Sequence, residues 1–308
     1  MSPPLLPSGE QIEIVHGEQR AWIVEVGGAL RAYRCGGHEV LDGYAADERC
    51  TDARGQSFVP WPNRVRNGCY RFAGKEHQLP LSEPARRNAI HGLVRWSSFA
   101  AAAREPDRVT MRSVLHPRDG YPFTLVVAIE YSLSPAGLTV TTTVTNAGAE
   151  RCPFGTGAHP YVTVGTPLID AASLRAPGRV RLLTDERGIP TGTTPTAGTE
   201  HDFRQARPLG PTVLDTAYTD LERGADGRAV VELAADADIA VSVWLDQAYP
   251  YLMLFTGDSL PDPGRQRRGL GVEPMTCAPD ALRSGEGVIV LEPEESFTGA
   301  WGITCRRS

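Results

Sequence analysis

Apolar segments of strand length follow one another along almost the whole 308-residue chain, with no long helical pattern between them. Each is rich in Val, Ile, Thr or aromatic residues and is bounded by Gly, Pro, Asn or Asp, which is typical of β-strands. They are RAWIVEVGG (20–28), RVTMRSVL (108–115), FTLVVAIEYSL (123–133), GLTVTTTVTN (137–146), RVRLLT (179–184), RAVVELA (228–234), IAVSVWLD (239–246), YLMLFTG (251–257) and GVIVLEP (287–293). Parallel strands need crossover connections, usually helices, so this order favours antiparallel pairing. We predict an all-β fold, a large antiparallel β-sandwich with few short helices.

Helical patterns are weak. LDTAYTDLER (214–223) and YAADER (44–49) could form short helices, but neither is long enough to cover a sheet. No linker or change of composition divides the sequence, so we expect a single domain over residues 1–308, with residues 1–9 as a loose N-terminal tail. The connections long enough to build a site are residues 43–68, 73–90, 184–212 and 258–286.

Composition and charge narrow the class of partner. The chain is 41% hydrophobic and 22% charged, which is ordinary for a globular protein, and its net charge is −6. Such a chain has no general positive field for nucleic acid or an anionic membrane. No apolar run approaches the roughly 20 residues of a membrane span, and the start does not resemble a secretory leader. We expect a cytoplasmic protein with no nucleic-acid or membrane partner, either a monomer or a homodimer.

Cofactor motifs are not evident. The six cysteines are widely spaced without a C-x-x-C pair, so we expect reduced thiols and no zinc or redox motif. GTGAHP (155–160) has Pro160 where a dinucleotide fingerprint needs its third glycine, and neither a phosphate-binding loop motif nor a G-x-S-x-G motif occurs. We expect no cofactor and no metal.

Polar residues in turn-rich, aromatic contexts are the candidate site residues. They are Asn63 and Arg64 in VPWPNRVRNG, His91 in RRNAIHGLVRW, His159 in GAHPYV, Asp215 in TVLDTAYTDL and Glu273 in GLGVEPMTCAPDA. Charged groups that hydrogen-bond hydroxyls, beside an aromatic face, suit a polyol such as a sugar. We expect Gly155 and Gly157 to adopt backbone conformations closed to other residues and, with Pro160, to present His159 from a tight loop.

Each candidate also has a purely structural explanation. Arg64 could belong to a surface ion pair, and the two histidines could bond backbone carbonyls within their loops. Asp215 could cap a short helix formed by the residues after it, and Glu273 could be an exposed acid. The residues alone leave these alternatives open.

The order of the motifs resembles a known family. NRV…NG, NAIHGL, YPFTLVVAIEYSL…LTVTTTVTNAG, GAHPYV, LDTAYTDL, VEPMTCAPDA and LEPEESFTGAWGI follow one another from about residue 10 to 305. This succession resembles the aldose 1-epimerase (galactose mutarotase-like) family and is most similar to a bacterial branch of uncertain sugar substrate. The resemblance implies a large antiparallel β-sandwich and a cofactor-free isomerase that interconverts the α and β anomers of a monosaccharide.

By position, the resemblance assigns the catalytic base to Glu273, the catalytic acid to His159 and a second active-site histidine to His91. It assigns substrate binding to Arg64 and Asp215, and we place Asn63 with them. The chain departs from the family at three positions. Many members have glycine where this chain has Leu93, histidine where it has Thr216, and glycine where it has Glu294.

Mutarotation needs a base for the proton of the anomeric hydroxyl and an acid for the ring oxygen, and we expect a Glu273 carboxylate and a His159 imidazolium. Two alternatives remain: a non-catalytic sugar-binding or regulatory protein, and a two-histidine, one-carboxylate metal enzyme built on His91, His159 and Glu273. The sugar could be a neutral hexose or a sulfo- or phospho-sugar. The cluster RQRR (265–268) could meet an anionic substituent or be a solvated loop.

Overall fold

The structure, a computed structural model, describes residues 5–235 and 239–307. Its helices are short: α1 (Ala281–Ser284) and the 3₁₀ helices η1 (Pro84–Arg86), η2 (Ile169–Ala171) and η3 (Pro263–Arg265). The remaining elements are strands, and the paired strands of both large sheets run antiparallel. The all-β, antiparallel prediction is therefore confirmed. No helix within the described ranges is long and apolar enough to cross a membrane.

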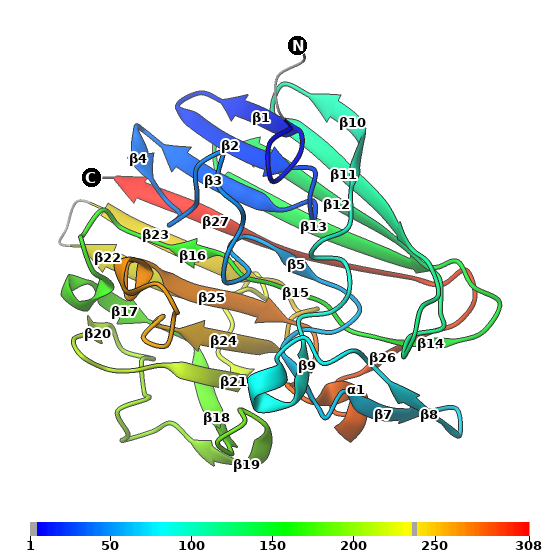
Figure 1. The fold of residues 1–308 in the computed structure, drawn as a ribbon. Helices are drawn as coiled ribbons and strands as arrows, with labels where there is room; N and C mark the ends of the chain where they lie inside the picture. Colours follow the sequence, from blue (N-terminus) through cyan, green and yellow to red (C-terminus); the bar gives the residue numbers. More distant parts are fainter. Residues whose placement is uncertain (1–4, 236–238, 308) are drawn as a thin grey trace.

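Two large sheets form the body of the molecule (Figure 1). The nine-stranded sheet has the order β10 (Ala100–Glu105), β11 (Arg108–Leu115), β12 (Leu125–Ser134), β13 (Gly137–Asn146), β27 (Ser296–Arg307), β23 (Ile239–Leu245), β22 (Ala229–Ala235), β17 (Ser173–Arg175), β20 (Arg207–Pro208). The eight-stranded sheet has the order β19 (Pro190–Pro195), β18 (Gly178–Thr184), β21 (Asp215–Leu221), β24 (Tyr251–Phe255), β25 (Leu270–Met275), β15 (Gly157–Ala158), β5 (Ser57–Phe58), with β16 (Tyr161–Val162) also paired to β25.

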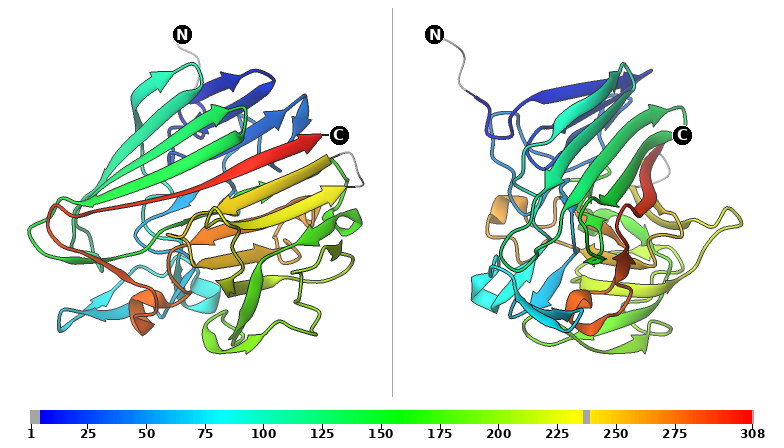
Figure 2. Two further views of the ribbon diagram at one scale, coloured as in Figure 1. Left: turned by 180° about the vertical axis from the view of Figure 1, so that it is seen from behind. Right: turned by 90° about the vertical axis from the view of Figure 1, so that its right-hand side faces the viewer.

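Smaller sheets complete the fold. A four-stranded sheet contains β1 (Gln11–His16), β2 (Gln19–Val24), β3 (Leu30–Cys35) and β4 (His38–Glu39), and the two-stranded pairs are β6 (Arg64–Arg66) with β9 (Asn88–Ile90), β7 (Cys69–Phe72) with β8 (Lys75–Gln78), and β14 (Cys152–Phe154) with β26 (Ile289–Leu291). In Figures 1 and 2 the blue strands β1–β3 lie over the face of β11–β13, and the hydroxyl of Tyr131 on β12 donates to the Gly28 carbonyl at 2.7 Å. The cyan hairpin β7–β8 lies beside α1.

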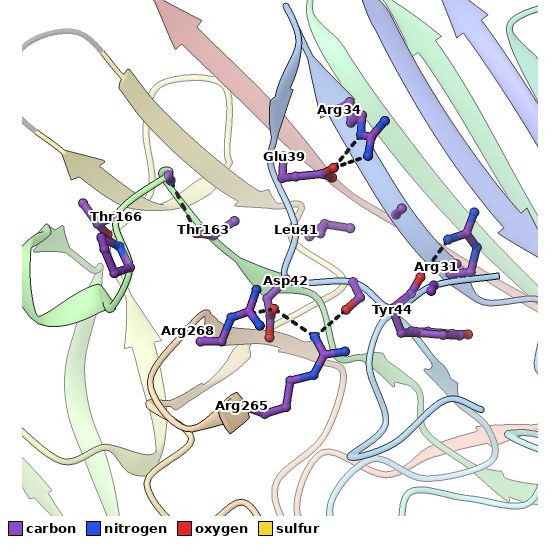
Figure 3. A pocket seen from close by; sticks show the side chains of 15 residues that line it. Arg31, Arg34, Glu39, Leu41, Asp42, Tyr44, Thr163, Thr166, Arg265 and Arg268 are labelled. Atoms are coloured by element: carbon purple, nitrogen blue, oxygen red, sulfur yellow. Dashed lines mark hydrogen bonds and ion pairs between the residues drawn. The ribbon is translucent and has the colours of Figure 1, made fainter. Parts of the chain in front are cut away.

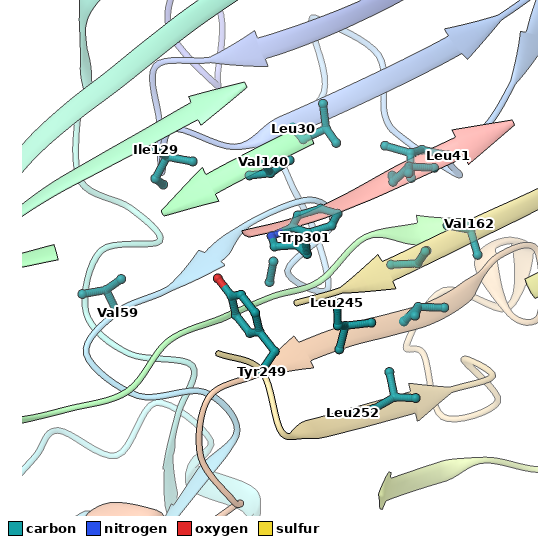
Figure 4. Packing of buried hydrophobic residues seen from close by; sticks show 14 of the residues in the cluster. Leu30, Leu41, Val59, Ile129, Val140, Val162, Leu245, Tyr249, Leu252 and Trp301 are labelled. Atoms are coloured by element: carbon teal, nitrogen blue, oxygen red, sulfur yellow. The ribbon is translucent and has the colours of Figure 1, made fainter. Parts of the chain in front are cut away.

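The core lies between the two large sheets. Along β12 buried and half-buried residues alternate strictly, as expected of a strand with one face on a core. One hydrophobic cluster joins residues of both sheets, among them Val140, Leu245, Leu252 and Trp301 (Figure 4). Because the sheets share one cluster, we infer that the chain folds as a single domain. Ser8, in the expected tail, is 2% exposed, whereas residues 1–4 lie outside the described part.

Both helix predictions are wrong. Residues 215–221 form β21, which pairs with β18 and β24, and residues 44–49 form a turn and irregular backbone. Thr216, Ala217 and Tyr218 are buried in the sheet. Strand pairing in the tertiary structure therefore determines the conformation of a segment whose helical pattern is weak. Asp215 therefore begins a strand and caps no helix. The observed α-helix, α1, instead follows Asp280.

Candidate active site

Antiparallel register brings His159 and Glu273 together. Gly157 lies opposite Met275, and Tyr161 lies opposite Gly271. His159 lies midway between Gly157 and Tyr161, and Glu273 lies midway between Gly271 and Met275. The two residues therefore face each other across the paired strands. The connection predicted over residues 258–286 thus contains a central strand, β25, and Glu273 stands on that strand instead of a loop.

On β25 the core face and the site face alternate. Val272 belongs to the main hydrophobic cluster. Glu273 points to the opposite face, where it is paired with Met253. Met253 belongs to a separate, small hydrophobic cluster on that face. Asp215 is paired with Phe255, and Ala217 with Met253, so Asp215 shares that face. Strands β21 and β25 therefore present the two acids on the same face of the sheet, with β24 between them.

His159 and Glu273 form a buried pair. Nε2 of His159 lies 3.2 Å from Oε1 of Glu273, and their side chains are 5% and 3% exposed. Burial, with a smaller contribution from Arg54, lowers the pKa of His159 to about 3. Burial and then the nearby Asp215 raise the pKa of Glu273 well above its usual range, against a lowering by Arg64. Loss of solvent thus favours the uncharged form of both groups. This resting state differs from the expected imidazolium and carboxylate.

Two polar atoms of this pair have no hydrogen-bond partner within the described residues: Nδ1 of His159 and Oε2 of Glu273. A buried polar atom without a partner is costly, by about 1–3 kcal/mol, and such atoms in native proteins call for an explanation. A ligand that hydrogen-bonds Oε2 would supply one.

His91 is held by Asn63. The N–H of Asn63 donates to Nδ1 of His91 at 3.2 Å, and the N–H of His91 donates to the Asn63 carbonyl at 2.9 Å. Both residues have left-handed backbone, with φ of 54° and 61°. Because a neutral imidazole that accepts at Nδ1 carries its proton on Nε2, His91 is a hydrogen-bond donor. Burial also lowers its pKa well below the usual value. Asn63 thus sets the tautomer of His91, a role that the sequence did not suggest.

Arg64 is oriented by an acid that sequence reasoning missed. Nε and Nη2 of Arg64 donate to the Glu83 carboxylate at 2.9 and 3.0 Å, and Asn88 donates to the same carboxylate at 2.9 Å. Glu83 is 19 residues from Arg64 in the chain, and no local pattern links the two. The carboxylate of Asp215 has no hydrogen bond or ion pair within the described part of the chain, so it is free to accept from a ligand.

Aromatic stacking fixes the ring of His159. The ring lies 4.5 Å from that of Tyr161 at 17°, and the guanidinium of Arg54 lies 4.8 Å from the Tyr161 ring centre. Arg54 is buried and is held by Asp52 at 2.7 Å. Tyr161 is two residues from His159, so strand alternation could have indicated it. Arg54 is a hundred residues away and could not be found in this way.

A cavity of about 300 Å³ opens in front of these groups. It lies within the range typical of small-molecule sites. Its lining includes all six predicted site residues, Asn63, Arg64, His91, His159, Asp215 and Glu273, together with Glu83, Arg95, Tyr161 and Phe255. The aromatic residues of the lining are thus Tyr161 and Phe255, whereas Trp61 is buried in the core and Trp96 is 54% exposed outside the cavity lining.

Gly155 and Gly157 are required for packing, not for an unusual backbone conformation. Neither has a positive φ. A Cβ atom would lie 2.5 Å from Sγ of Cys277 at Gly155 and 2.7 Å from the Pro274 carbonyl at Gly157. The glycines let this segment approach β25 closely enough for His159 to reach Glu273. The conformational argument made from the sequence was therefore wrong at these two positions.

The arginines of the 265–268 cluster lie elsewhere. Arg265 and Arg268 line a separate cleft of about 730 Å³ that contains none of the predicted site residues (Figure 3). Both lie close to Asp42, at 3.2 and 3.6 Å, and Arg267 pairs with Asp170 and Asp258. Arg265 and Arg267 are 19% and 13% exposed, so they are structural residues and neither a solvated loop nor part of the candidate site.

His91, His159 and Glu273 also have metal-like spacing, since one possible ligand atom from each lies within 4.8 Å of the others. The donor set does not fit a metal, however. Nδ1 of His91 already accepts a backbone N–H, and Nε2 must then carry the proton, so His91 offers no free lone pair.

Comparisons with known proteins agree with this fold. A family model, aldose 1-epimerase, matches residues 10–304. The uncharacterized protein YihR of Escherichia coli (strain K12) is 31% identical over 299 residues, covering 96% of this chain and 94% of YihR. Among solved structures, the GalM/aldose epimerase homologue from C. elegans superposes with a TM-score of 0.86 at 16% identity, covering 97% and 99% of the two chains. Galactose 1-epimerase from Lactobacillus acidophilus NCFM gives 0.81 at 19% identity, covering 97% and 94%. The chain belongs to the aldose 1-epimerase family.

Proposed function

We propose that the protein is an aldose 1-epimerase that interconverts the α and β anomers of a monosaccharide through the open-chain aldehyde. The observation that carries the proposal is the buried His159–Glu273 pair, 3.2 Å apart and facing a cavity large enough for a small molecule. Ring opening needs one proton taken from the anomeric hydroxyl and one given to the ring oxygen. A close acid–base pair supplies both transfers.

Glu273 acts as the base. Its carboxylate, which lines the cavity, accepts from the anomeric hydroxyl and takes that proton as the bond between C1 and the ring oxygen breaks. His159, as the acid, protonates the ring oxygen. C1 rotates, and ring closure on the other face of the aldehyde returns both protons. No atom is gained or lost, and the pair ends as it began.

The charge states follow from the short contact. The pair holds one mobile proton, which can sit on Glu273, with both groups neutral, or on His159, with both charged. Burial favours the neutral arrangement in the free protein. Hydrogen bonds from sugar hydroxyls to the Glu273 carboxylate favour the charged arrangement, in which His159 can donate. Substrate binding thus favours the state in which His159 carries the proton and can act as the acid.

The remaining cavity residues bind and orient the sugar. His91 donates from Nε2, the Arg64 guanidinium is held rigid by Glu83, and the unpaired Asp215 carboxylate accepts from hydroxyls. Asn63 contributes through His91 and the cavity wall. Tyr161 and Phe255 supply apolar surface for the ring carbons.

Anomer exchange measured by NMR saturation transfer or polarimetry tests the proposal. We expect the purified protein to accelerate exchange of an aldose, Glu273→Gln and His159→Asn each to lose about 10²- to 10⁴-fold in turnover, and Arg64→Ala mainly to raise KM. Sugar binding without faster exchange would instead establish the non-catalytic binding protein. Full activity in Glu273→Gln would remove the base assignment.

The metal alternative makes a different prediction. A chelator should leave the exchange rate unchanged, and elemental analysis of the purified protein should find no stoichiometric transition metal. One equivalent of iron bound through His91, with activity lost on chelation and restored on reloading, would contradict the acid–base proposal.

A further inference from the structure

A buried arginine stands behind the candidate acid. The side chain of Arg54 is 1% exposed, and its guanidinium carbon lies over the ring of Tyr161, 4.8 Å from the ring centre. Tyr161 in turn stacks on His159, with ring centres 4.5 Å apart and an angle of 17° between the planes. The guanidinium, the phenol and the imidazole therefore form one stack. Burying a charge in such a place is costly, so its presence calls for an explanation.

Hydrogen bonds hold the guanidinium in this stack. Nη1 of Arg54 donates to the Asp52 carboxylate at 2.7 Å, and its Nε and Nη2 each lie 3.4 Å from one oxygen of Asp42. Asp42 is shared with Arg265, at 3.2 Å. The hydroxyl of Tyr161 donates to the Asp52 carbonyl at 3.1 Å. Asp52 thus fixes both the guanidinium and the phenol.

The segment that carries Arg54 is bonded directly to His159. The N–H of Gly55 donates to the His159 carbonyl at 2.9 Å, and the N–H of His159 donates to the Gln56 carbonyl at 3.0 Å. The two residues before Arg54 have left-handed backbone, with φ of 53° and 60°. This conformation is unfavourable for residues with a side chain and is found most often at functional sites. The backbone therefore fixes the guanidinium relative to the imidazole.

The other neighbours of the His159 ring are uncharged rings and one acid. Phe58 and Phe255 meet it edge-on, with ring centres at 5.9 and 6.3 Å, and the ring of His91, a neutral donor, lies at 5.8 Å. Glu273 contacts Nε2. In the charged arrangement of the pair, an imidazolium at His159 would thus have the Glu273 carboxylate at its edge and a second cation behind its face.

The charge of Arg54 opposes protonation of His159. After burial it is the largest influence lowering the pKa of His159, and Arg95 acts in the same direction. Like charges repel more strongly where water is excluded. When substrate binding places the proton on His159, the imidazolium is therefore held against this repulsion, and release of the proton to the ring oxygen relieves it.

From this geometry we propose that Arg54 is a positioning residue for the acid: through the Tyr161 ring it fixes the plane of the His159 imidazole and keeps a permanent positive charge behind it, which favours release of the proton. The inference rests on the proposed function, because it takes His159 as the group that protonates the ring oxygen.

The repulsion acts on one of the two complexes in the reaction. In the cyclic complex His159 is charged, whereas in the open-chain complex His159 is neutral and Glu273 holds a proton. Arg54 raises the free energy of the first complex relative to the second, so ring opening is less unfavourable. Binding is weakened for the same reason, because it must charge His159. Removal of Arg54 should therefore lower kcat and KM together.

The test is a charge-balanced double variant, Arg54→Gln with Asp52→Asn, which removes the cation together with the acid that it binds most closely. With D-galactose and D-glucose as probes, we expect kcat of anomer exchange to fall by about 10-fold and KM to fall by a similar factor, the scale of one nearby charge. A merely structural loss would loosen the site, and KM would then rise.

Two further variants separate charge from packing. Arg54→Lys keeps the charge and the bond to Asp52 but loses the planar stack, so kcat and KM should each fall less than in the double variant. The control is Arg204→Gln with Asp202→Asn, a pair at 2.8 Å outside the cavity lining, which should leave both constants unchanged. Thermal unfolding verifies that each variant is folded.

NMR of the ligand-free protein gives a readout that does not depend on activity. The imidazole nitrogen signals of His159, assigned by comparison with His159→Asn, should show protonation at a pH about one unit higher in the double variant than in the wild type. This shift without exchange of any sugar would refute the epimerase alone. Exchange with no such shift, or a rise in KM in either Arg54 variant, would overturn the role of Arg54.

Discussion

Glu273 and His159 are almost inaccessible to solvent, yet each has a polar atom that finds no partner among the described residues. At the residue scale, the requirements of catalysis and of stability therefore oppose each other in the same side chains. A buried acid whose protonation is forced by its surroundings is expected at a catalytic centre and costs folding free energy.

Glu273→Gln should stabilise the protein while it abolishes activity. The folded pKa of Glu273 is raised, so its contribution to stability is fully present below the unfolded pKa of 4.5 and is lost as pH rises through the folded value. Glutamine has no proton to lose. We expect a gain of about 1 kcal/mol, or roughly 2 °C in Tm, at pH 8, and a smaller gain at pH 4.5. Calorimetry at both pH values measures it, and a lower Tm at pH 8 would contradict the argument.

The pH profile of kcat/KM should have an alkaline limb set by Glu273. The active pair holds one proton, so activity falls as pH rises through the raised pKa of Glu273. Asp215 raises this pKa and Arg64 lowers it. Asp215→Asn should therefore move the limb to lower pH and Arg64→Gln to higher pH, whatever each does to the maximal rate. Shifts in the same direction would refute the assignment of the limb to Glu273.

At the scale of secondary-structure elements, the site depends on how closely the segment around His159 approaches β25. His159 and Glu273 each lie midway between two residues that are paired across the strands. A one-residue change of register would therefore turn one of the two side chains to the other face of the sheet. The close approach is possible because Gly157 has no side chain.

Gly157→Ala should push this segment away from β25, since its Cβ would lie 2.7 Å from the Pro274 carbonyl. We expect a loss of about 1–3 kcal/mol in unfolding free energy together with a large fall in turnover. Gly192→Ala is the matched control, because Gly192 also lies on a strand but has open space at its Cβ position. Denaturant unfolding and anomer exchange should show the control unchanged. Full activity in Gly157→Ala would mean that the close approach is not needed.

At the scale of the whole molecule, one hydrophobic cluster spans both large sheets, and the site lies on the opposite face of one of them. Burying a common core is what makes separate parts of a chain fold together. The site should therefore be lost together with the fold and not before it.

Urea unfolding should show this as a single cooperative transition. Far-UV circular dichroism, tryptophan fluorescence and residual anomer exchange should give the same midpoint. Loss of exchange at a clearly lower urea concentration would show that the site opens independently. Two separated transitions in circular dichroism would contradict the single-domain proposal.

Much of the fold could be predicted from the sequence because strand alternation and turn residues are local patterns. All nine predicted segments contain a strand, and the six predicted site residues line one cavity. The segment after Asp215 was predicted wrongly as a helix, since its weak local preference is overridden by its neighbours β18 and β24. The order of motifs identified the family because it spans the whole chain.

Properties that depend on distant neighbours were decided only by the tertiary structure. The pairing of His159 with Glu273 depends on the register of β25, and the tautomer of His91 depends on Asn63. The neutral resting state comes from burial, which a sequence does not display. The sequence by itself determined which chemical groups are present and that they follow strands. The tertiary structure decided their distances and their protonation, because contact and solvent exclusion arise between segments far apart in the chain.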